Sequence, residues 1–325
     1  YRQFVAGETT REMVLPTSPK DKIISRRSND VQIAATGNHL LAAWQIAGTG
    51  YAHRGPIRTA ESFDGGLTWR QSAPPTAGNH TDDQGFFDID ADNRGAFHII
   101  WLDRAENSPG RRSAAKGLRY AMLSGSRWSQ PQTIDAETCQ CCWNRLSRNP
   151  QGELFALYRN ARPRDMALAK FDGKAWNKLG IVDGFGWKVE LCPHAGGGLA
   201  VDRGNTYAVT WTGLESSVGC HLTRKRNSET AWQKPTKFGN ASARNGDIAL
   251  SGAHIAVVWD EFEGNNRHAK WMRLNNSNTT ALPAAQTLSS GAAASYPRVV
   301  SDGMDFFAFW TETMNGEAVI RGRKL

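Results

Sequence analysis

The sequence lacks the features that mark several common classes of protein. No apolar run approaches the roughly 18 residues that a membrane-spanning helix needs, so no membrane span is expected. There is no glycine-rich loop to cradle a phosphate, no histidine pair of the zinc-protease type and no turn that would carry a serine nucleophile. The basic residues, which give a net charge of +8, are scattered rather than gathered into blocks, so no nucleic-acid binding is expected. The chain also opens at Tyr1 without a Met or an apolar signal core, and we expect its targeting segment to have been removed.

What the chain does contain is a repeat. An aromatic residue closes a short apolar run six times, at Trp44, Trp101, Tyr158, Trp211, Trp259 and Trp310. The intervals are 57, 57, 53, 48 and 51 residues, a length that fits four strands and their loops. The sequence therefore predicts an all-β fold, a six-bladed β-propeller with four antiparallel strands per blade. Because six copies use up the 325 residues, we expect a single domain spanning 1–325.

One repeat shows the pattern within a blade. Residues 31–45 predict a strand, a tight turn at Gly37-Asn38 and a second strand that ends near Trp44. The last repeat runs out after its third strand, at Leu325. We expect the N-terminal stretch Arg2–Val14 to supply the missing outer strand and so to close the last blade.

The first repeat carries a recognisable turn motif. Residues 62–69 read Ser-Phe-Asp-Gly-Gly-Leu-Thr-Trp, which matches the Asp-box S-x-D-x-G-x-T-W, and weaker copies follow in other repeats. In such a turn the Asp side chain would accept backbone N–H groups and the glycines would take positive φ. On this motif and the repeat, the whole chain resembles the sialidase-like (BNR-repeat) propeller superfamily. The resemblance implies a fold and says almost nothing about activity.

The cysteines are the strongest functional signal. The repeat assigns all five, with two histidines, to one rim of the predicted channel: Cys139, Cys141, Cys142, Cys192, His194, Cys220 and His221. Thiolates grouped with imidazoles suit a soft or borderline metal ion. The sequence thus predicts a metal site between the third and fourth blades, with copper favoured and zinc as the alternative. Cys-x-Cys-Cys is not a zinc-ribbon spacing.

Two other uses of the cysteines stay open. Exported proteins use cysteines for disulfides, and a bond across neighbouring blades would staple the rim. An odd count of five leaves at least one thiol unpaired within the chain. A redox-active dithiol is the third possibility.

The chain also resembles a branch of secreted bacterial sialidase-like proteins. The shared features are Cys-x-Cys-Cys at the start of one blade, a following Tyr158-Arg159, and Cys192-Pro193 at the start of the next blade. This resemblance implies a shared site and a periplasmic or secreted location. If the protein is an enzyme, redox chemistry at copper is the expected use, with a small or anionic substrate at the channel mouth. The side chains expected to take part or to line the substrate side are Trp143, Arg145, Arg159 and Asp83.

Two hypotheses come from other classes of protein. Sialidases hold a carboxylate with three arginines and use a Tyr nucleophile, for which Arg27, Arg244, Arg298 and Tyr296 are candidates. The first-blade Arg-Ile-Pro signature of that family is missing, since Ser28 follows Arg27. The other hypothesis is a non-catalytic propeller that binds a glycan or a protein loop.

Overall fold

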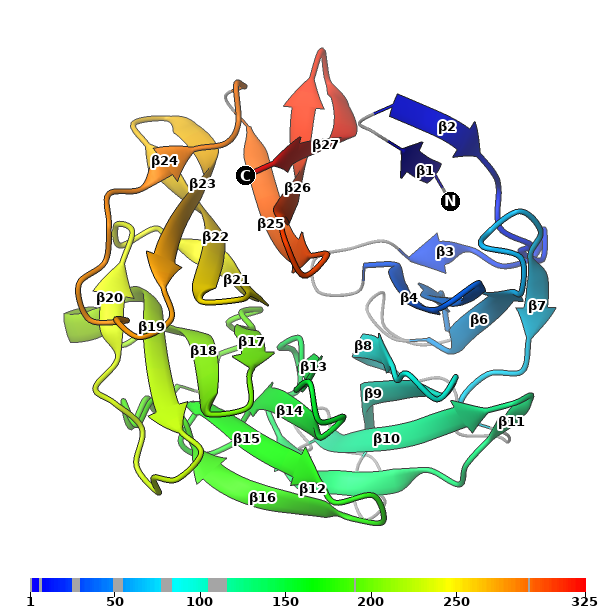
Figure 1. Cartoon of the computed structure of the whole chain (residues 1–325), viewed down its shortest axis with the longest axis horizontal. Coiled ribbons are helices and arrows are strands. Elements are labelled where there is room, and N and C mark those ends of the chain that lie inside the picture. Colours follow the sequence, from blue (N-terminus) through cyan, green and yellow to red (C-terminus); the bar gives the residue numbers. More distant parts are fainter. Residues whose placement is uncertain are drawn as a thin grey trace. The chain divides into compact units, whose positions relative to one another are not determined.

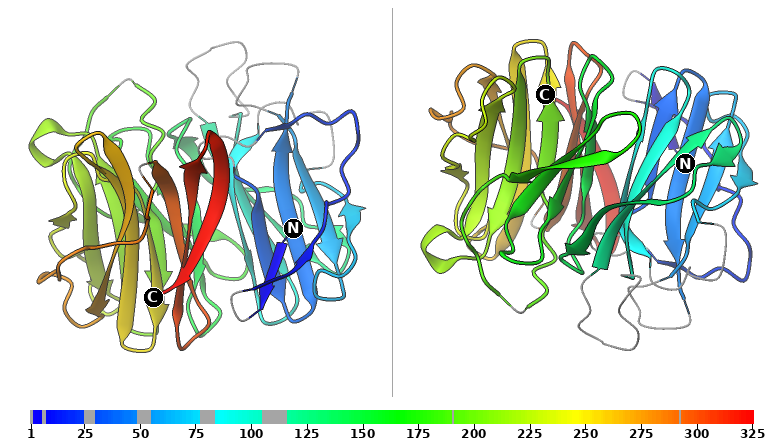
Figure 2. Two further views of the ribbon diagram at one scale, coloured as in Figure 1. Left: turned by 90° about the horizontal axis from the view of Figure 1, so that it is seen from above. Right: turned by 90° about the horizontal axis from the view of Figure 1, so that it is seen from below.

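The computed structural model describes residues 2–5, 8–24, 30–48, 55–76, 84–104, 116–189, 191–291 and 293–325. The chain divides into two compact units, Tyr1–Gln140 and Cys141–Leu325. The described residues are almost entirely strand, and their one helix, Glu215–Ser217, has three residues, so none of them forms a helix able to cross a membrane. Figure 1 shows the strands in chain order, and Figure 2 shows the strands of each sheet running side by side with loops at both ends.

The first unit holds two antiparallel sheets and a hairpin. The hairpin pairs β1 (Arg2–Val5) with β2 (Glu8–Glu12). One sheet has the order β3-β5-β6-β7, with β4 also on β5, and its strands are β3 (Ile23–Ile24), β4 (Gln32–Thr36), β5 (His39–Ile46), β6 (Ile57–Ser62) and β7 (Arg70–Ser72). The other has the order β11-β10-β9-β8, with β12 also on β10, and its strands are β8 (Gly85–Ala91), β9 (Phe97–Arg104), β10 (Lys116–Ser124), β11 (Arg127–Trp128) and β12 (Gln132–Thr138).

The second unit holds four antiparallel sheets, each in chain order. The first comprises β13 (Arg145–Arg148), β14 (Leu154–Arg159), β15 (Met166–Phe171) and β16 (Trp176–Ile181). The second comprises β17 (Gly198–Val201), β18 (Asn205–Thr212), β19 (Gly219–Arg226) and β20 (Thr236–Phe238). The third comprises β21 (Arg244–Ser251), β22 (His254–Glu263), β23 (Asn266–Asn275) and β24 (Gln286–Thr287). The last comprises β25 (Ala294–Ser301), β26 (Phe306–Met314) and β27 (Glu317–Lys324).

Within each unit, the sheets pack through their first strands. In the second unit β13 contacts β17, β17 contacts β21, and β21 contacts β25; in the first unit β4 contacts β8. The apolar side chains that alternate along these strands meet in the layers between neighbouring sheets, with Trp101 in one such layer and Trp259 in another. Both indoles are at most 1% exposed, and truncating a buried Trp to Ala typically costs about 3–5 kcal/mol. The repeat residues Trp44, Trp101, Trp211, Trp259 and Trp310 thus all belong to buried apolar clusters.

The N-terminal stretch forms two short strands. β1 pairs with β2, from Arg2↔Glu12 to Val5↔Glu8. The two segments pair their backbone groups with each other in a hairpin, and the closure of the last blade by this stretch stays a prediction. The last sheet has three strands, and β27 pairs only with β26 in the part of the chain that the structure describes.

The Asp-box turn between β6 and β7 has the expected construction. The Asp64 carboxylate accepts the Thr68 backbone N–H at 2.8 Å and the Thr68 hydroxyl at 2.6 Å. Gly65 and Gly66 have φ of 71° and 90°, a region that side-chain-bearing residues rarely adopt. The Trp69 indole donates to the Gly66 carbonyl at 3.2 Å and packs on the apolar cluster around Trp44. These hydrogen bonds, those to Thr68 first, lower the pKa of Asp64 to about 2.

Candidate metal centre

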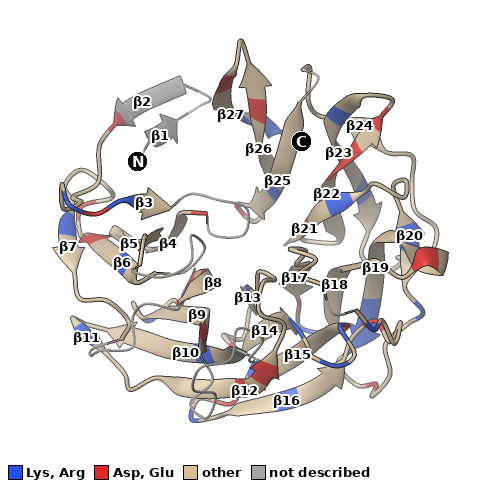
Figure 3. Ribbon diagram, turned by 180° about the vertical axis from the view of Figure 1, so that it is seen from behind, with Lys and Arg blue, Asp and Glu red and all other residues tan. Residues whose placement is uncertain are grey.

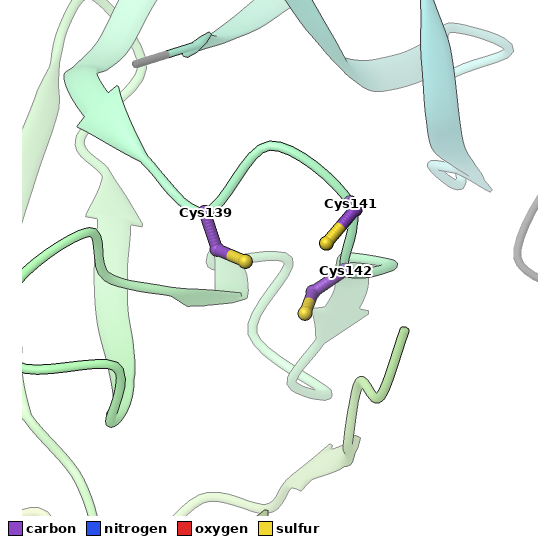
Figure 4. Close-up of side chains that lie close together, drawn as sticks. All are labelled: Cys139, Cys141 and Cys142. Atoms are coloured by element: carbon purple, nitrogen blue, oxygen red, sulfur yellow. The ribbon is translucent and has the colours of Figure 1, made fainter. Parts of the chain in front are cut away.

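Three of the five cysteines come together in one short segment. The chain leaves β12 at Thr138 and enters β13 at Arg145, and between them lie Cys139, Cys141 and Cys142. Their Sγ atoms all lie within 4.8 Å of one another, and Figure 4 shows the three side chains close together. The side chains are 2%, 5% and 1% exposed. Because four consecutive residues carry all three thiols, their spacing is set by the local path of the chain.

The spacing suits a metal ion. A zinc–sulfur bond is about 2.3 Å long, so sulfurs around one such ion stand roughly 3.7–4.0 Å apart in tetrahedral or trigonal geometry. The observed grouping needs only small adjustments to reach that geometry.

The residues that follow the thiols are packed tightly. The Trp143 indole is 6% exposed and lies against the backbone of Gly196, where a Cβ would stand only 2.0 Å from its Cδ1 atom. Position 196 therefore requires a glycine, because the Trp143 ring leaves no room for a Cβ atom. Arg145, at the start of β13, is 8% exposed, and its Nε lies 3.6 Å from the Asp247 carboxylate on β21. The contact of Trp143 with Gly196 and the ion pair of Arg145 with Asp247 thus hold the backbone that follows Cys142.

Two of the seven predicted ligands lie elsewhere. Cys220 and His221 are neighbours on β19 and so point to opposite faces of their sheet. Cys220 belongs to the apolar cluster around Trp211 and Trp259, and burial, followed by the nearby Asp260 charge, raises the pKa of its thiol well above the ordinary range. The His221 ring packs on the Phe185 ring, with 4.7 Å between the ring centroids. Burial lowers the pKa of the His221 imidazole to about 4. Among the described residues the group within 4.8 Å consists of Cys139, Cys141 and Cys142 alone, and metal binding by Cys192, His194, Cys220 or His221 stays a prediction.

Cys192 and His194 lie on a loop held at both of its ends. The Val189 carbonyl accepts Arg164 Nε at 2.7 Å, and the Ala195 carbonyl accepts Arg159 Nε at 3.2 Å. Cys192 itself is exposed. His194 is half-buried, and its φ of 48° brings Nδ1 within 3.0 Å of the Cys192 carbonyl. A carbonyl oxygen only accepts, so Nδ1 is the donor in this hydrogen bond.

The remaining predicted catalytic residues have separate positions. Arg159 is 1% exposed and donates to three backbone carbonyls, those of Arg164, Ala195 and Trp211. Its observed role is to join these backbone segments, and its contact with a substrate stays a prediction. Asp83 lies outside the described residues.

The sequence reasoning missed a buried carboxylate near this loop. Asp183 is 7% exposed, and burial raises the pKa of its carboxyl to about 7, while the Arg159 charge opposes this effect and the Asp165 charge adds to it. Its Oδ1 accepts the Met166 backbone N–H at 3.0 Å. In the sequence Val182-Asp183-Gly184 reads as an ordinary turn, so burial was the only signal that could have found it.

The residues of the sialidase hypothesis are only partly placed. Arg27 lies outside the described residues. Arg244 stacks over the Trp211 ring at 4.8 Å. Tyr296 has φ of 56°, held by its backbone N–H donating to the buried Asp260 carboxylate at 2.8 Å, and Arg298 follows it on β25. The substrate-binding role of this set stays a prediction.

Comparisons with known proteins give the fold. No protein-family model and no curated protein matches the sequence. A sialidase of Trypanosoma rangeli, solved with the inhibitor DANA, is similar in structure with a TM-score of 0.52 and 10% identity; the match covers 98% of this chain and 56% of that one. The Aleuria aurantia lectin, a fucose-recognising six-bladed β-propeller, has a TM-score of 0.50 and 12% identity over 90% of this chain and 94% of the lectin.

These likenesses and the series of antiparallel sheets define the class: the chain is an all-β protein of the six-bladed β-propeller class. At such low identity the similarity extends to the fold alone. The single domain predicted over 1–325 stays a prediction. Acidic and basic residues are spread over the strands of both units, as the sequence indicates (Figure 3).

Proposed function

We propose that this protein binds a thiophilic metal ion through Cys139, Cys141 and Cys142, and that the ion is Cu(I). The observation that supports the proposal is the convergence of three buried thiols within 4.8 Å of one another. Three deprotonated thiols would place three negative charges in a buried site, which is costly unless a cation compensates them. Metal binding supplies that cation and releases the thiol protons.

The number of donors favours copper over zinc. Structural zinc is almost always four-coordinate, and no fourth described His, Cys, Asp or Glu joins the group. Cu(I) is soft and is selected by thiolate ligands, so a purely sulfur-lined site matches it. Zinc would need a further donor, such as water, inside a buried site.

A redox role would rest on the same ion. Copper can pass between Cu(I) and Cu(II), and the indole of Trp143 directly follows the last ligand in the chain. Arg145 and Asp247 provide charged groups at the start of β13 and on β21. A substrate at this place would be small or anionic.

The proposal is tested by loading reduced protein with Cu(I) in competition with a chromophoric Cu(I) chelator, together with elemental analysis of protein purified without chelator. We expect one copper per chain and a thiolate-to-metal charge-transfer band in the ultraviolet. Cys220→Ala is the matched control, because it removes a thiol outside the group and should leave copper binding intact. Absence of copper binding, with the three thiols still reduced, would overturn the proposal.

A further inference from the structure

Arg159 joins three segments of the second unit from a buried position. Its guanidinium donates to the backbone carbonyls of Arg164, Ala195 and Trp211, and the side chain is 1% exposed. All three acceptors are neutral, although a guanidinium bonds a carboxylate about twice as strongly as a neutral oxygen. The bond to Ala195, at 3.2 Å, is the longest of the three. A stronger acceptor close to the guanidinium would therefore displace Ala195 first.

A carboxyl group with an unused oxygen lies beside this arginine. Asp183 Oδ1 accepts the backbone N–H of Met166 at 3.0 Å, and Met166 pairs directly with Arg159 across β14 and β15. Residues paired in this way have Cα atoms about 4.5–5.5 Å apart. Asp183 is 7% exposed, and its Oδ2 is buried without a hydrogen-bond partner among the described residues. A buried oxygen without a donor is costly, most of all when it carries a charge.

We infer that Asp183 and Arg159 form a pH-sensitive switch that holds or releases the backbone at Ala195. While Asp183 is protonated, Arg159 keeps the Ala195 carbonyl. When Asp183 loses its proton to solvent, the guanidinium turns to the Oδ2 atom and gives up Ala195. Loss of the carboxyl proton is the only covalent change. The new bond joins two opposite charges and satisfies the buried oxygen, which offsets the lost bond to Ala195.

The switch acts on the candidate metal centre through one contact. Gly196 directly follows Ala195, and its backbone lies against the Trp143 ring, where a Cβ would stand only 2.0 Å from Cδ1. Trp143 directly follows Cys142, whose side chain is 1% exposed. Release of Ala195 lets Gly196 move away from the indole, and the buried thiol segment becomes accessible. The switch controls this access whether or not the thiols bind copper, so it goes beyond the proposed function.

The charged groups around Asp183 set the pH at which the switch works. Burial raises the pKa of the Asp183 carboxyl to about 7, the Arg159 charge opposes this effect and the Asp165 charge adds to it. From β19, the His221 ring packs on the ring of Phe185, two residues after Asp183. Burial lowers the pKa of His221 to about 4. His221 is therefore neutral between pH 6 and pH 8, whereas Asp183 changes its charge in that range.

Neighbouring side chains hold the segment that leads from the carboxyl group to the loop. Asp165 accepts the backbone N–H groups of Gly186 at 2.6 Å and Trp187 at 3.1 Å. Arg164 Nε donates to the Val189 carbonyl at 2.7 Å. These hydrogen bonds do not involve the arginine of the switch, so the segment stays in place when the switch releases the loop.

The test follows iodoacetamide labelling of the reduced, metal-free full chain at pH 6 and pH 8, resolved by peptide mass spectrometry. Ionised Asp183 rises from about a tenth of the molecules at pH 6 to about nine-tenths at pH 8. We therefore expect the labelling rate of Cys142 in wild type, divided by that in Asp183→Asn at the same pH, to rise about tenfold. This division removes the effect of pH on the thiol itself. Asp172→Asn, in an exposed turn of the same sheet, is the matched control and should behave like wild type.

Two further measurements separate the switch from general unfolding. Cys220 is 0% exposed in an apolar core, so its labelling reports opening of the whole sheet and should not follow that of Cys142. Hydrogen exchange of the wild-type chain needs no variant, and protection at residues 191–196 should fall about tenfold from pH 6 to pH 8.

Three results would overturn the switch: equal labelling of Cys142 in wild type and Asp183→Asn at pH 8, parallel rises at Cys142 and Cys220, or unchanged protection of the loop. No copper is present in these measurements. Failure of the switch and failure of copper binding are therefore seen separately.

Discussion

The Asp-box turn and the cysteine segment make opposite uses of reactive side chains. In the Asp-box turn the Asp64 oxygens are occupied by groups within four residues, namely Ser62 and Thr68. The turn is partly exposed, and its hydrogen bonds need no residue from outside the motif. In the cysteine segment three soft donors lie close together in a buried position (Figure 4). In the Asp-box turn the Asp64 oxygens already accept hydrogen bonds within the turn. In the cysteine segment the three sulfurs lie close enough together to bind one metal ion.

The same contrast separates two carboxylates. Local hydrogen bonds, first those to Thr68, lower the pKa of Asp64 to about 2. Burial raises the pKa of Asp183, near the loop that carries Cys192, to about 7. The Asp-box carboxylate is thus stabilised as an anion by its own turn, whereas the buried Asp183 carboxyl is not fully stabilised as an anion by the fold.

The largest expected effect is on metal binding. Cys142→Ser removes one of three sulfur donors and should weaken Cu(I) binding by at least roughly 100-fold, since even ligand-supporting residues are worth 10- to 100-fold. Competition titration with a Cu(I) chelator measures the loss. Asp64→Ala is the matched change in the Asp-box turn and should leave the affinity unaltered. Equal Cu(I) affinity in Cys142→Ser and wild type would show that the cysteine segment, like the Asp-box turn, does not bind the ion.

The pH dependence of stability should be dominated by Asp183 rather than Asp64 near neutrality. Between the ordinary pKa of 3.8 and the folded value of about 7, the native state holds the proton more strongly than the unfolded state. Stability therefore falls as pH rises through this window, by on the order of a few kcal/mol, and is level above it. Asp183→Asn keeps the Oδ1 acceptor for Met166 and should flatten this slope in urea unfolding at pH 5 and pH 8. An unchanged slope would show that the buried carboxyl is not the cause.

An added methyl group should destabilise the protein more at Gly196, beside Trp143, than at Gly204 in an open turn. Gly196→Ala places a Cβ 2.0 Å from Trp143 Cδ1, so the indole or the backbone must move, at a cost of about 1–3 kcal/mol. Gly204→Ala is the control, because its nearest neighbour, Asp202 Oδ1, is at an ordinary 3.7 Å. Urea unfolding of both variants measures the difference. Similar stabilities would mean that the contact between Trp143 and Gly196 is readily relieved.

The smallest expected effect is in the Asp-box turn itself. Asp64→Ala leaves the Thr68 N–H and hydroxyl without their acceptor, but both are exposed and water replaces it. We expect the thermal unfolding midpoint to fall by only a few degrees, with no change in copper binding. Calorimetry at neutral pH checks the first expectation. A severe loss of stability would mean that the motif organises more than its own turn.

The parts of the fold that repeat were predictable because repetition exposes them. Trp101 and Trp259 recur at the same point of the pattern, and both belong to buried apolar clusters in the structure. The Asp-box turn is also local, so its hydrogen bonds can be read from eight residues. The pairing of β1 with β2 could not be predicted from the sequence, because a short strand at the end of a chain has several possible partners and the pattern of side chains does not choose among them.

The candidate site was half predictable for the same reason. Cys139, Cys141 and Cys142 lie within four residues, so their convergence needed only a turn. Whether Cys220 joined them depended on which face of β19 it occupied and on what covered that face. Its position in an apolar cluster, like the burial of Asp183, arises from side chains distant in sequence.

By itself the sequence determined the number of repeats, the β-strand pattern, the Asp-box turn and a dense group of thiols, because each of these is written within one repeat or one turn. The tertiary structure alone decided which thiols are buried together, which one faces solvent, and that Gly196 must make room for Trp143. Those properties depend on the packing of segments far apart in the chain, and burial, which sets both reactivity and access, exists only once that packing has formed.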